Sequence, residues 1–496
     1  MSSTLVLLIV TPFVAAVATF LLPVVISRIV TVVAGAVAFG ISLILVPAIT
    51  ARGQISAGGL LRVDSLSVVF LVATTFLYLA TAVFAGGYLQ LANSAAGTRY
   101  GRRFHAGLNL FCWSMVAAPL VNGLALLWVA VEITTVVSAL LVAIDDTEGA
   151  SEASWKYVLI ASLGLGIALL ATILMYAAGT TVLGSAYDLS YTRLLAGAGR
   201  LPPDAVRLAF VLAVLGYGTK MGLVPVHTWL PDAHSEAPTP VSALLSGALL
   251  ATSFYAILRY FQVAIRTLGP TFPRNVLLIF GLASLLLAAF YLLSQRDLKR
   301  LLAYSSVEHM GILAIGMSFG APIAVVGVLL HVLAHAAAKG TAFFGAGSII
   351  RKFDTKDMSK IRGGVGALPW SGPMFVAAVL ALSAMPPFGV FRSEFLIVAG
   401  GLSDPRDTVT AALVVLVTLA FFGLSLFTTQ TMLTPDGAGA SSGGTGVIAP
   451  AKGEVSAWIV AAMALGLVAL AILGVHPPSE LSQLLHEAAS ELGRKR

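Results

Sequence analysis

The chain has 496 residues, of which 58% are hydrophobic and only 10% are charged. A soluble domain carries roughly 25% charged residues, so these proportions exclude an ordinary soluble protein. They also exclude a disordered chain, because so much apolar surface offsets the entropy that is lost on ordering. The class that remains is a multi-pass membrane protein.

The one cysteine, Cys112, has no partner within the chain for a disulfide or a cysteine-based metal site. The net charge of +7 comes from basic residues scattered between apolar runs, which favours contact with a lipid bilayer over contact with nucleic acid. We therefore expect no cofactor and no metal ion bound by this chain, and any redox centre would belong to a partner chain.

The apolar runs have the length of membrane-spanning helices and do not alternate as outer-membrane strands would. The run from Leu108 to Ile144 is too long for one span, and Asn122-Gly123 is the expected turn within it. The sequence thus predicts an all-α fold of about fourteen spans, near 3–22, 25–47, 65–90, 105–121, 124–144, 157–178, 206–226, 241–265, 275–295, 302–319, 321–346, 370–401, 408–432 and 454–474.

Seven charged residues lie well inside these spans, away from the span ends, and each costs about 2.5–3.5 kcal/mol at a helix centre on insertion scales. Such residues are kept where water, partners or a function are close. They are Glu132, Lys220, Arg259, Glu308, Lys339, Arg392 and Glu394.

Histidines join this set at membrane depth. His309 follows Glu308, and His331, His335 and Lys339 are one turn apart on one helix face. Side chains that hold and release protons in such a setting are typical of a proton route.

Structural alternatives exist for several of these residues. Arg259 can extend from a helix end to the membrane surface, and Arg392 can pair with Glu394. Glu308 and His309 follow a basic loop closely enough to lie at the membrane interface.

Two spans carry helix-breaking residues beside a charge. The seventh reads GYGTKMGLVP (216–225) with Pro225, and the twelfth reads MPPFGVFRSE (385–394) with Pro386 and Pro387. Proline removes a backbone donor and glycine weakens a helix, so both spans should be interrupted. The two breaks are five spans apart, so, unless glycine and proline fall there by chance, they predict two repeats of five helices each. Because five is an odd number, the second repeat is inverted in the membrane relative to the first.

The expected organisation follows from this spacing. Residues 1–104 hold the first three helices, 105–265 hold the first repeat (spans four to eight) and 275–432 hold the second, inverted repeat (spans nine to thirteen). Residues 433–496 hold a Gly/Ser-rich loop, helix fourteen and a short basic tail. The basic clusters RDLKR and RKFDTKDMSKIR mark the cytoplasmic side, which places both termini outside the cell (inner or plasma) membrane.

Four segments in order resemble the antiporter-like subunits of respiratory complex I, Mrp cation/proton antiporters and group 4 membrane-bound nickel–iron hydrogenases. They are KMGLVPVHTWLPDAHSEAPTPVSALLSG, RDLKRLLAYSSVEHMG, HVLAHAAAKGTAFFGAGSI and PPFGVFRSEFLI. The YSSVEHMG and PPFGVFRSEF stretches look more like the F-type component of hydrogenase-4 and formate hydrogenlyase than like the complex I chains.

The resemblance implies half-channels joined by a polar axis along the middle of the membrane. It implies that Glu132 and Lys220 form an acid–base pair that switches between paired and separated, that Lys339 is the central lysine and that Glu394 is the terminal residue. His227 and His234 fall in its loop motif, and from the residues alone they can equally be loop-capping groups.

One departure concerns span eight, where many complex I members carry a lysine and this chain has Ala251. The resemblance then requires water, histidines or Arg259 to connect Lys220 with the centre.

These observations predict a proton-translocating subunit of a redox-driven respiratory or hydrogenase-type complex. Its expected partners are other membrane subunits and a peripheral arm with iron–sulfur clusters. The alternatives are a subunit of a secondary cation/proton antiporter or ion-driven uptake system without redox partners, and a scaffold that conducts nothing.

Overall fold

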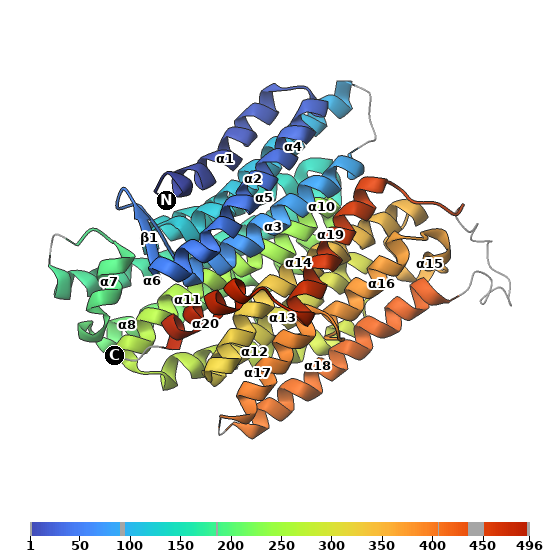
Figure 1. Cartoon of the computed structure of the whole chain (residues 1–496). Coiled ribbons are helices and arrows are strands. Elements are labelled where there is room, and N and C mark those ends of the chain that lie inside the picture. The colour runs from blue at the N-terminus through green and yellow to red at the C-terminus, as the bar shows by residue number, and fades with distance from the viewer. Residues whose placement is uncertain (1, 90–94, 185–186, 405, 435–450, 494–496) are drawn as a thin grey trace.

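The computed structural model describes the whole chain except residues 1, 90–94, 185–186, 405, 435–450 and 494–496. Most of the predicted Gly/Ser-rich loop at 434–453 therefore lies outside the described residues. The described chain is almost entirely helical, and its long helices pack side by side in one elongated bundle (Figure 1).

The first half of the chain contains one small sheet among its helices. The elements are α1 (Ser2–Leu21), α2 (Val24–Arg52), β1 (Gln54–Ala57), β2 (Leu61–Asp64), α3 (Ser65–Tyr88), α4 (Ala95–Leu120), α5 (Leu124–Val142), η1 (Ala143–Asp145), α6 (Glu148–Leu183), α7 (Tyr191–Gly197), η2 (Ala198–Arg200), α8 (Pro203–Met221), α9 (Trp229–Glu236), α10 (Thr239–Leu244), the π-helical turn η3 (Leu245–Leu249) and α11 (Leu250–Leu268).

The second half contains helices and no strand among its described elements. Its elements are α12 (Thr271–Leu292), α13 (Leu298–Phe319), α14 (Pro322–Phe353), η4 (Met358–Lys360), α15 (Gly364–Ala367), α16 (Ser371–Leu382), α17 (Gly389–Leu402), α18 (Asp407–Thr428), the π-helical turn η5 (Thr429–Leu433), α19 (Ala457–Val475) and α20 (Ser479–Gly493).

Ten helical segments of the described chain are long and apolar enough to cross a membrane. They are α1, α2, α3, α5 with η1, α6, α10 to α11, α12, α14, α18 with η5, and α19. The chain is therefore a mostly helical, multi-pass membrane protein, as its composition predicts.

The helices begin and end where local chemistry requires it. Asp64 caps α3 by accepting from the Ser67 amide, and Asp297 caps α13 by accepting from the amides of Lys299 and Arg300. The chain also turns at Asn122-Gly123, where α4 ends and α5 begins, as expected.

Both helix interruptions occur where glycine and proline predict them. The helix α8 ends at Met221 because Gly222 adopts a left-handed conformation (φ +85°), and Pro225 follows. Residues 383–388, which include Pro386 and Pro387, separate α16 from α17. These breaks bring non-helical backbone next to Lys220 and Glu394.

The start of α1 meets a small hairpin that was not predicted from the sequence, and the C-terminal helix α20 meets the start of α3, which directly follows this hairpin. Strands β1 and β2 pair antiparallel, with Gln54 opposite Asp64. The Ser2 hydroxyl donates to the Ser56 carbonyl at 3.3 Å, and the Ser65 hydroxyl donates to Glu487 at 3.2 Å. Figure 1 shows both termini near this end of the bundle.

Candidate functional site

Lys220 is a fully buried amine whose described hydrogen-bond partners are uncharged. It lies in the last turn of α8, and its Nζ donates to Thr135 Oγ1 at 2.6 Å and to Tyr157 Oη at 2.6 Å. The amine also lies 4.9 Å from the centre of the Tyr157 ring, within the range of a cation–π contact. Helices α5 and α6 thus supply a polar socket for a residue on α8.

The socket continues into a short chain of hydroxyls. Ser138 Oγ donates to the Thr134 carbonyl at 2.5 Å, so its remaining lone pairs accept the proton of Tyr157 Oη, 2.7 Å away. Tyr157 Oη is then free to accept from Lys220. This order of donors directs both hydroxyl protons away from the amine and leaves a lone pair of Tyr157 Oη facing Lys220.

Glu132 lies one turn before Thr135 on α5, and its carboxylate is not paired with Lys220. Its Oε1 accepts from Ser162 Oγ at 3.3 Å, and its buried Oε2 has no hydrogen-bond partner in the described chain. No Glu132–Lys220 oxygen–nitrogen distance of 4.0 Å or less occurs among the described residues. The structure therefore holds this acid and base apart.

His234 lies between the Lys220 socket and α14. Trp229 stacks on Tyr157 at 4.4 Å between ring centres, and the His234 ring is 6.2 Å from Trp229 and 6.0 Å from Phe343 of α14. Its Nδ1 donates to the Leu230 carbonyl at 2.7 Å, which leaves the lone pair on the buried, unpartnered Nε2. His227 is also buried, and its Nδ1 has no partner among the described residues.

Lys339 is buried in the middle of α14. Its Nζ donates to the Leu302 carbonyl of α13 at 2.8 Å. His335 and His331 precede it by one and two turns, so α14 presents three ionisable side chains along one buried stripe.

Three histidines and one carboxylate form a compact group that we call the His–Glu cluster, consisting of His309, His331, His335 and Glu394. His309 Nδ1 lies 3.1 Å from His331 Nε2 and 3.8 Å from Glu394 Oε1. The His335 ring centre is 5.1 Å from that of His309 and 6.1 Å from that of His331. Helices α13, α14 and α17 therefore bring together residues that the sequence alone places in separate spans.

Glu308 is buried inside the helical bundle. It lies in the middle of α13, its side chain is 2% exposed, and its Oε2 has no partner in the described chain. Glu308 and His309 are therefore both enclosed by protein, and their depth in the membrane stays a prediction.

The structure separates Arg259 from this group. Its guanidinium forms a bidentate pair with Asp64 at 2.7 and 2.8 Å and also donates to Ser67, Tyr255 and Gln262. Burial alone would raise the pKa of Asp64, but Arg259 and Arg62 hold it well below its usual range. Arg259 is therefore committed to a structural ion pair.

Arg392 does not pair with Glu394, contrary to the structural alternative raised for it. Its exposed guanidinium donates to the carbonyls of Gly474 and Val475 at 3.3 and 3.4 Å, at the end of α19. Glu394 points the other way and is 8% exposed.

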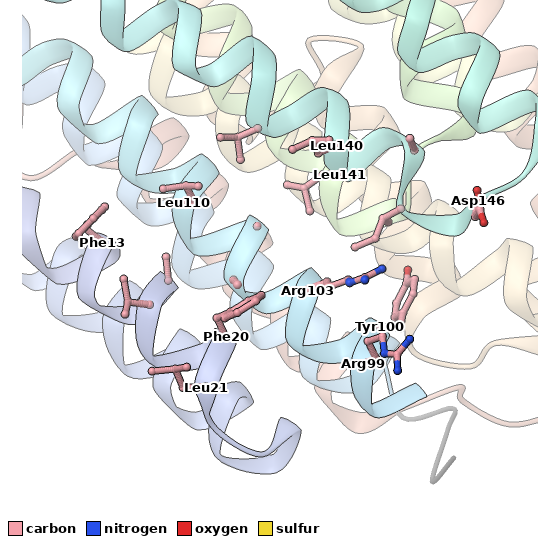
Figure 2. A pocket seen from close by; sticks show the side chains of 17 residues that line it. Phe13, Phe20, Leu21, Arg99, Tyr100, Arg103, Leu110, Leu140, Leu141 and Asp146 are labelled. Atoms are coloured by element: carbon pink, nitrogen blue, oxygen red, sulfur yellow. The ribbon is translucent and has the colours of Figure 1, made fainter. Parts of the chain in front are cut away.

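Two pockets lie beside this framework. One of about 430 Å³ is lined by Glu394 and by mainly apolar residues of α13, α17, α18 and the break before α17. Another, of about 930 Å³, is mainly apolar between α1, α4 and α5, with Arg99, Arg103 and Asp146 toward one end (Figure 2). The second pocket contains none of the buried ionisable residues described above.

The hydroxyl partners of these residues were not predicted from the sequence. Thr135 is three residues after Glu132, so helical spacing was a usable signal for this residue. Tyr157 carried no such signal, because it is 63 residues from Lys220.

Comparison with known proteins supplies further evidence. Residues 121–423 match the family described as NADH:quinone oxidoreductase/Mrp antiporter, TM. The chain is 37% identical over 350 residues to the hydrogenase-4 component F homolog of Methylacidiphilum infernorum (isolate V4), covering 70% of this chain and 73% of that protein.

Two solved structures share the fold at low sequence identity. A chain of the membrane-bound sulfane sulfur reductase, an archaeal respiratory membrane complex, superposes with a TM-score of 0.85 at 20% identity, covering 99% of this chain and 98% of the other. A chain of the Mrp complex from Dietzia sp. DQ12-45-1b gives 0.84 at 22%, covering 99% and 97%.

Proposed function

Because the chain belongs to the NADH:quinone oxidoreductase/Mrp antiporter transmembrane family, we propose that it translocates protons as a membrane subunit of a redox-driven respiratory or hydrogenase-type complex. The observation that carries the proposal is the buried Lys220 amine, which is held by hydroxyl groups while the Glu132 carboxylate remains unpaired one turn from Thr135.

The separation of Glu132 and Lys220 is the basis of the first transfer step. A pair of opposite charges 4 Å apart is worth about 4 kcal/mol at an effective dielectric constant near 20. A buried ammonium without a carboxylate also carries a large desolvation penalty. When Glu132 approaches Lys220, the ion pair therefore stabilises the proton on Lys220. When the two residues separate, release of this proton is favoured.

His234 is the group that receives this proton in the proposed route. Its free Nε2 lone pair can accept a proton, and its ring lies between Trp229 and Phe343. This position compensates for Ala251, where many complex I members have a lysine. Lys339 is the next acceptor, and its partner in this structure is the Leu302 carbonyl.

The second half of the route runs through the His–Glu cluster. His309 Nδ1 faces both His331 Nε2 and Glu394 Oε1, so one imidazole can exchange a proton with a base on either side. Glu394 lines a pocket and is the proposed terminal residue of the route. Glu308, buried on the same helix as His309, supplies a further carboxylate, while His227 and Pro225 lie at the first helix break.

We also propose the finer topology. The ten apolar segments together with α4, α8, α13 and the interrupted pair α16–α17 make fourteen spans, with inverted repeats at spans four to eight and nine to thirteen. An even number of spans agrees with the contact of α1 with β1 and the contact of α20 with the start of α3, because the start of α3 directly follows the hairpin. The basic loop clusters support a cytoplasmic position for the opposite side of a plasma membrane.

The proposed partners are other membrane subunits and a peripheral arm that carries iron–sulfur clusters, with no redox centre in this chain. The test is proton pumping by the assembled complex reconstituted in vesicles. Lys220→Ala and Lys339→Ala are expected to abolish pumping while assembly persists, and Lys156→Ala, an exposed lysine on α6, is the control. Unchanged pumping per redox turnover in both buried-lysine variants would contradict the proposal.

A further inference from the structure

The His–Glu cluster has the geometry of a metal site as well as that of a proton relay. One potential ligand atom from each of His309, His331 and Glu394 lies within 4.8 Å of the other two, and all three residues are buried. They come from three different helices, α13, α14 and α17, so the bundle itself holds them together.

The distances suit a tetrahedral ion. Zinc binds nitrogen at about 2.0–2.1 Å and carboxylate oxygen at about 2.0–2.2 Å, which places neighbouring tetrahedral ligands about 3.4 Å apart. The observed separations of 3.1 Å (His309 Nδ1 to His331 Nε2) and 3.8 Å (His309 Nδ1 to Glu394 Oε1) lie on either side of that value. Movements of these side chains by a few tenths of an ångström would bring both separations to the tetrahedral value.

A hydrogen bond to Ser393 orients His331 so that it can act as a metal ligand. Ser393 Oγ donates to the Val390 carbonyl at 2.7 Å, so it accepts from His331 Nδ1, 2.9 Å away. The proton is therefore on Nδ1, and the lone pair is on Nε2, which faces His309. Metal-binding histidines in proteins are oriented by this kind of contact.

Binding breaks one hydrogen bond, between His309 Nδ1 and His331 Nε2, while several other polar atoms of the site have no partner to lose. The buried Nε2 atoms of His309 and His335 and the Oε1 atom of Glu394 have no hydrogen-bond partner in the described chain. His309 can move its proton from Nδ1 to Nε2 and so release the Nδ1 lone pair. His335 supplies a fourth nitrogen nearby, and the pocket beside Glu394 leaves room for a water ligand.

We propose that His309, His331 and Glu394 bind a borderline divalent transition-metal ion, with Zn²⁺ as the representative, and that the bound ion blocks proton transfer. Imidazole nitrogens suit zinc-class ions, whereas Mg²⁺ and Ca²⁺ require oxygen ligands. The ion acts as an inhibitor and not as a resident cofactor, because it occupies the lone pairs that accept protons in the proposed route. The inhibition of proton transfer rests on the proposed function, whereas the binding of the metal ion does not depend on it.

Binding is tested on the purified complex in detergent with Zn²⁺ alone, by equilibrium dialysis and zinc-edge X-ray absorption. The exposed His476 and His486 are replaced by alanine in every variant to remove surface sites. We expect one zinc that is lost in His309→Gln and in Glu394→Gln, with nitrogen and oxygen ligands at about 2.0–2.2 Å. His105→Gln, a buried histidine on α4, is the control that keeps the zinc.

A Ser393→Ala variant tests whether Ser393 orients His331 as a metal ligand, and it distinguishes this effect from a general loss of folding. Removing a group that orients a ligand typically weakens metal affinity about tenfold to a hundredfold. Ser383→Ala, which lies on the same pocket wall, is expected to match the parent. Parent-like zinc binding in both His309→Gln and Glu394→Gln, or equal affinities in Ser393→Ala and Ser383→Ala, would overturn the site.

The predicted inhibition of proton pumping by bound zinc is measured separately from zinc binding. Zn²⁺, but not Mg²⁺, is expected to stop pumping by the parent complex in vesicles, and Ser393→Ala should need about tenfold more zinc or higher. Pumping that persists with zinc bound at the site would overturn the block and leave the binding result intact. Lys220→Ala is expected to bind zinc normally, so a failure of the proton route is distinguishable from a failure of the metal site.

Discussion

The amine of Lys220 and the phenol oxygen of Tyr157 are 2.6 Å apart, and the proton of that phenol is directed toward Ser138 at 2.7 Å. Tyr157 is therefore an acceptor for the lysine in the state where Glu132 is separated from it. This contact links α6 to the C-terminal end of α8, where the helix is interrupted. The Tyr157 hydroxyl is thus part of the proposed switch between Glu132 and Lys220.

Tyr157→Phe is expected to slow proton pumping while the complex still assembles. The ring keeps its contact with Trp229, but Lys220 loses a hydrogen bond of the charged class, worth about 1.5–3 kcal/mol. That range corresponds to roughly a tenfold to hundredfold lower rate in vesicles. Tyr176→Phe, on the same helix with a partly exposed ring, is the control, and equal rates for the two variants would contradict this role.

Asp64→Asn is expected to destabilise the protein strongly. Its carboxylate and the Arg259 guanidinium are 2% and 4% exposed, and removing one partner of a buried pair typically costs about 3–5 kcal/mol. Asp204→Asn breaks the Arg207 pair, whose carboxylate is 94% exposed, and should change stability by less than about 1 kcal/mol. Thermal unfolding in detergent compares the two, and equal midpoints would show that the Asp64 pair is dispensable.

Docking of α20 is expected to weaken as the pH rises. Burial and the neighbouring Asp64 raise the pKa of Glu491 from 4.5 to about 7, against the opposing effect of Arg259 and Arg62. The docked helix binds this proton more tightly than the free helix, so docking is strongest at low pH and loses up to about 3 kcal/mol as the pH rises from 4.5 through 7.

Hydrogen exchange of residues 479–493 between pH 5 and 8, corrected for intrinsic exchange rates, measures this effect. Protection should fall with rising pH in the parent and in Glu480→Gln, which changes an exposed residue of α20. Glu491→Gln should remove the dependence, and an unchanged profile in that variant would assign the pH response to another group.

Gly216→Ala is expected to separate α6 from α8. A Cβ atom at this position would lie 2.6 Å from the Gly164 carbonyl oxygen and 2.6 Å from the Ala168 amide, both of which belong to backbone that cannot yield locally. Overpacking of this kind typically costs about 1–3 kcal/mol. Gly166→Ala, which meets no heavy atom within 4 Å, serves as the control in thermal unfolding, and a Gly216→Ala midpoint at or above that of the control would refute the close contact.

Features that depend on local chemistry could be predicted from the sequence. The interruptions at Pro225 and at Pro386 follow from the missing amide of proline, which acts wherever the residue lies. Helix ends were harder to place, because hydropathy marks the membrane-crossing part and not the cap. Helix α6 starts at Glu148, beside the Thr147 cap, although its apolar run was expected from 157. The β1–β2 hairpin has strands of four residues each, too short to carry a periodic signal.

The partners of the buried charges depend on contacts between distant helices and could not be predicted. Arg259 pairs with Asp64, 195 residues away, because the middle of α11 packs near the start of α3. Arg392 and Glu394 are two positions apart on one helix, which turns their side chains to different faces. The sequence indicated which residues were unusual at membrane depth, and the packing of the bundle decided which of them meet.

The most direct test of the proposed switch is the number of protons moved per redox turnover by the assembled complex carrying Glu132→Gln. Glutamine preserves the hydrogen bond to Ser162 but cannot form an ion pair with Lys220, so proton movement should fall to background while electron transfer continues. Glu152→Gln, an exposed position on α6, should pump as the parent does. A parent-like proton ratio in Glu132→Gln would contradict the switch between Glu132 and Lys220.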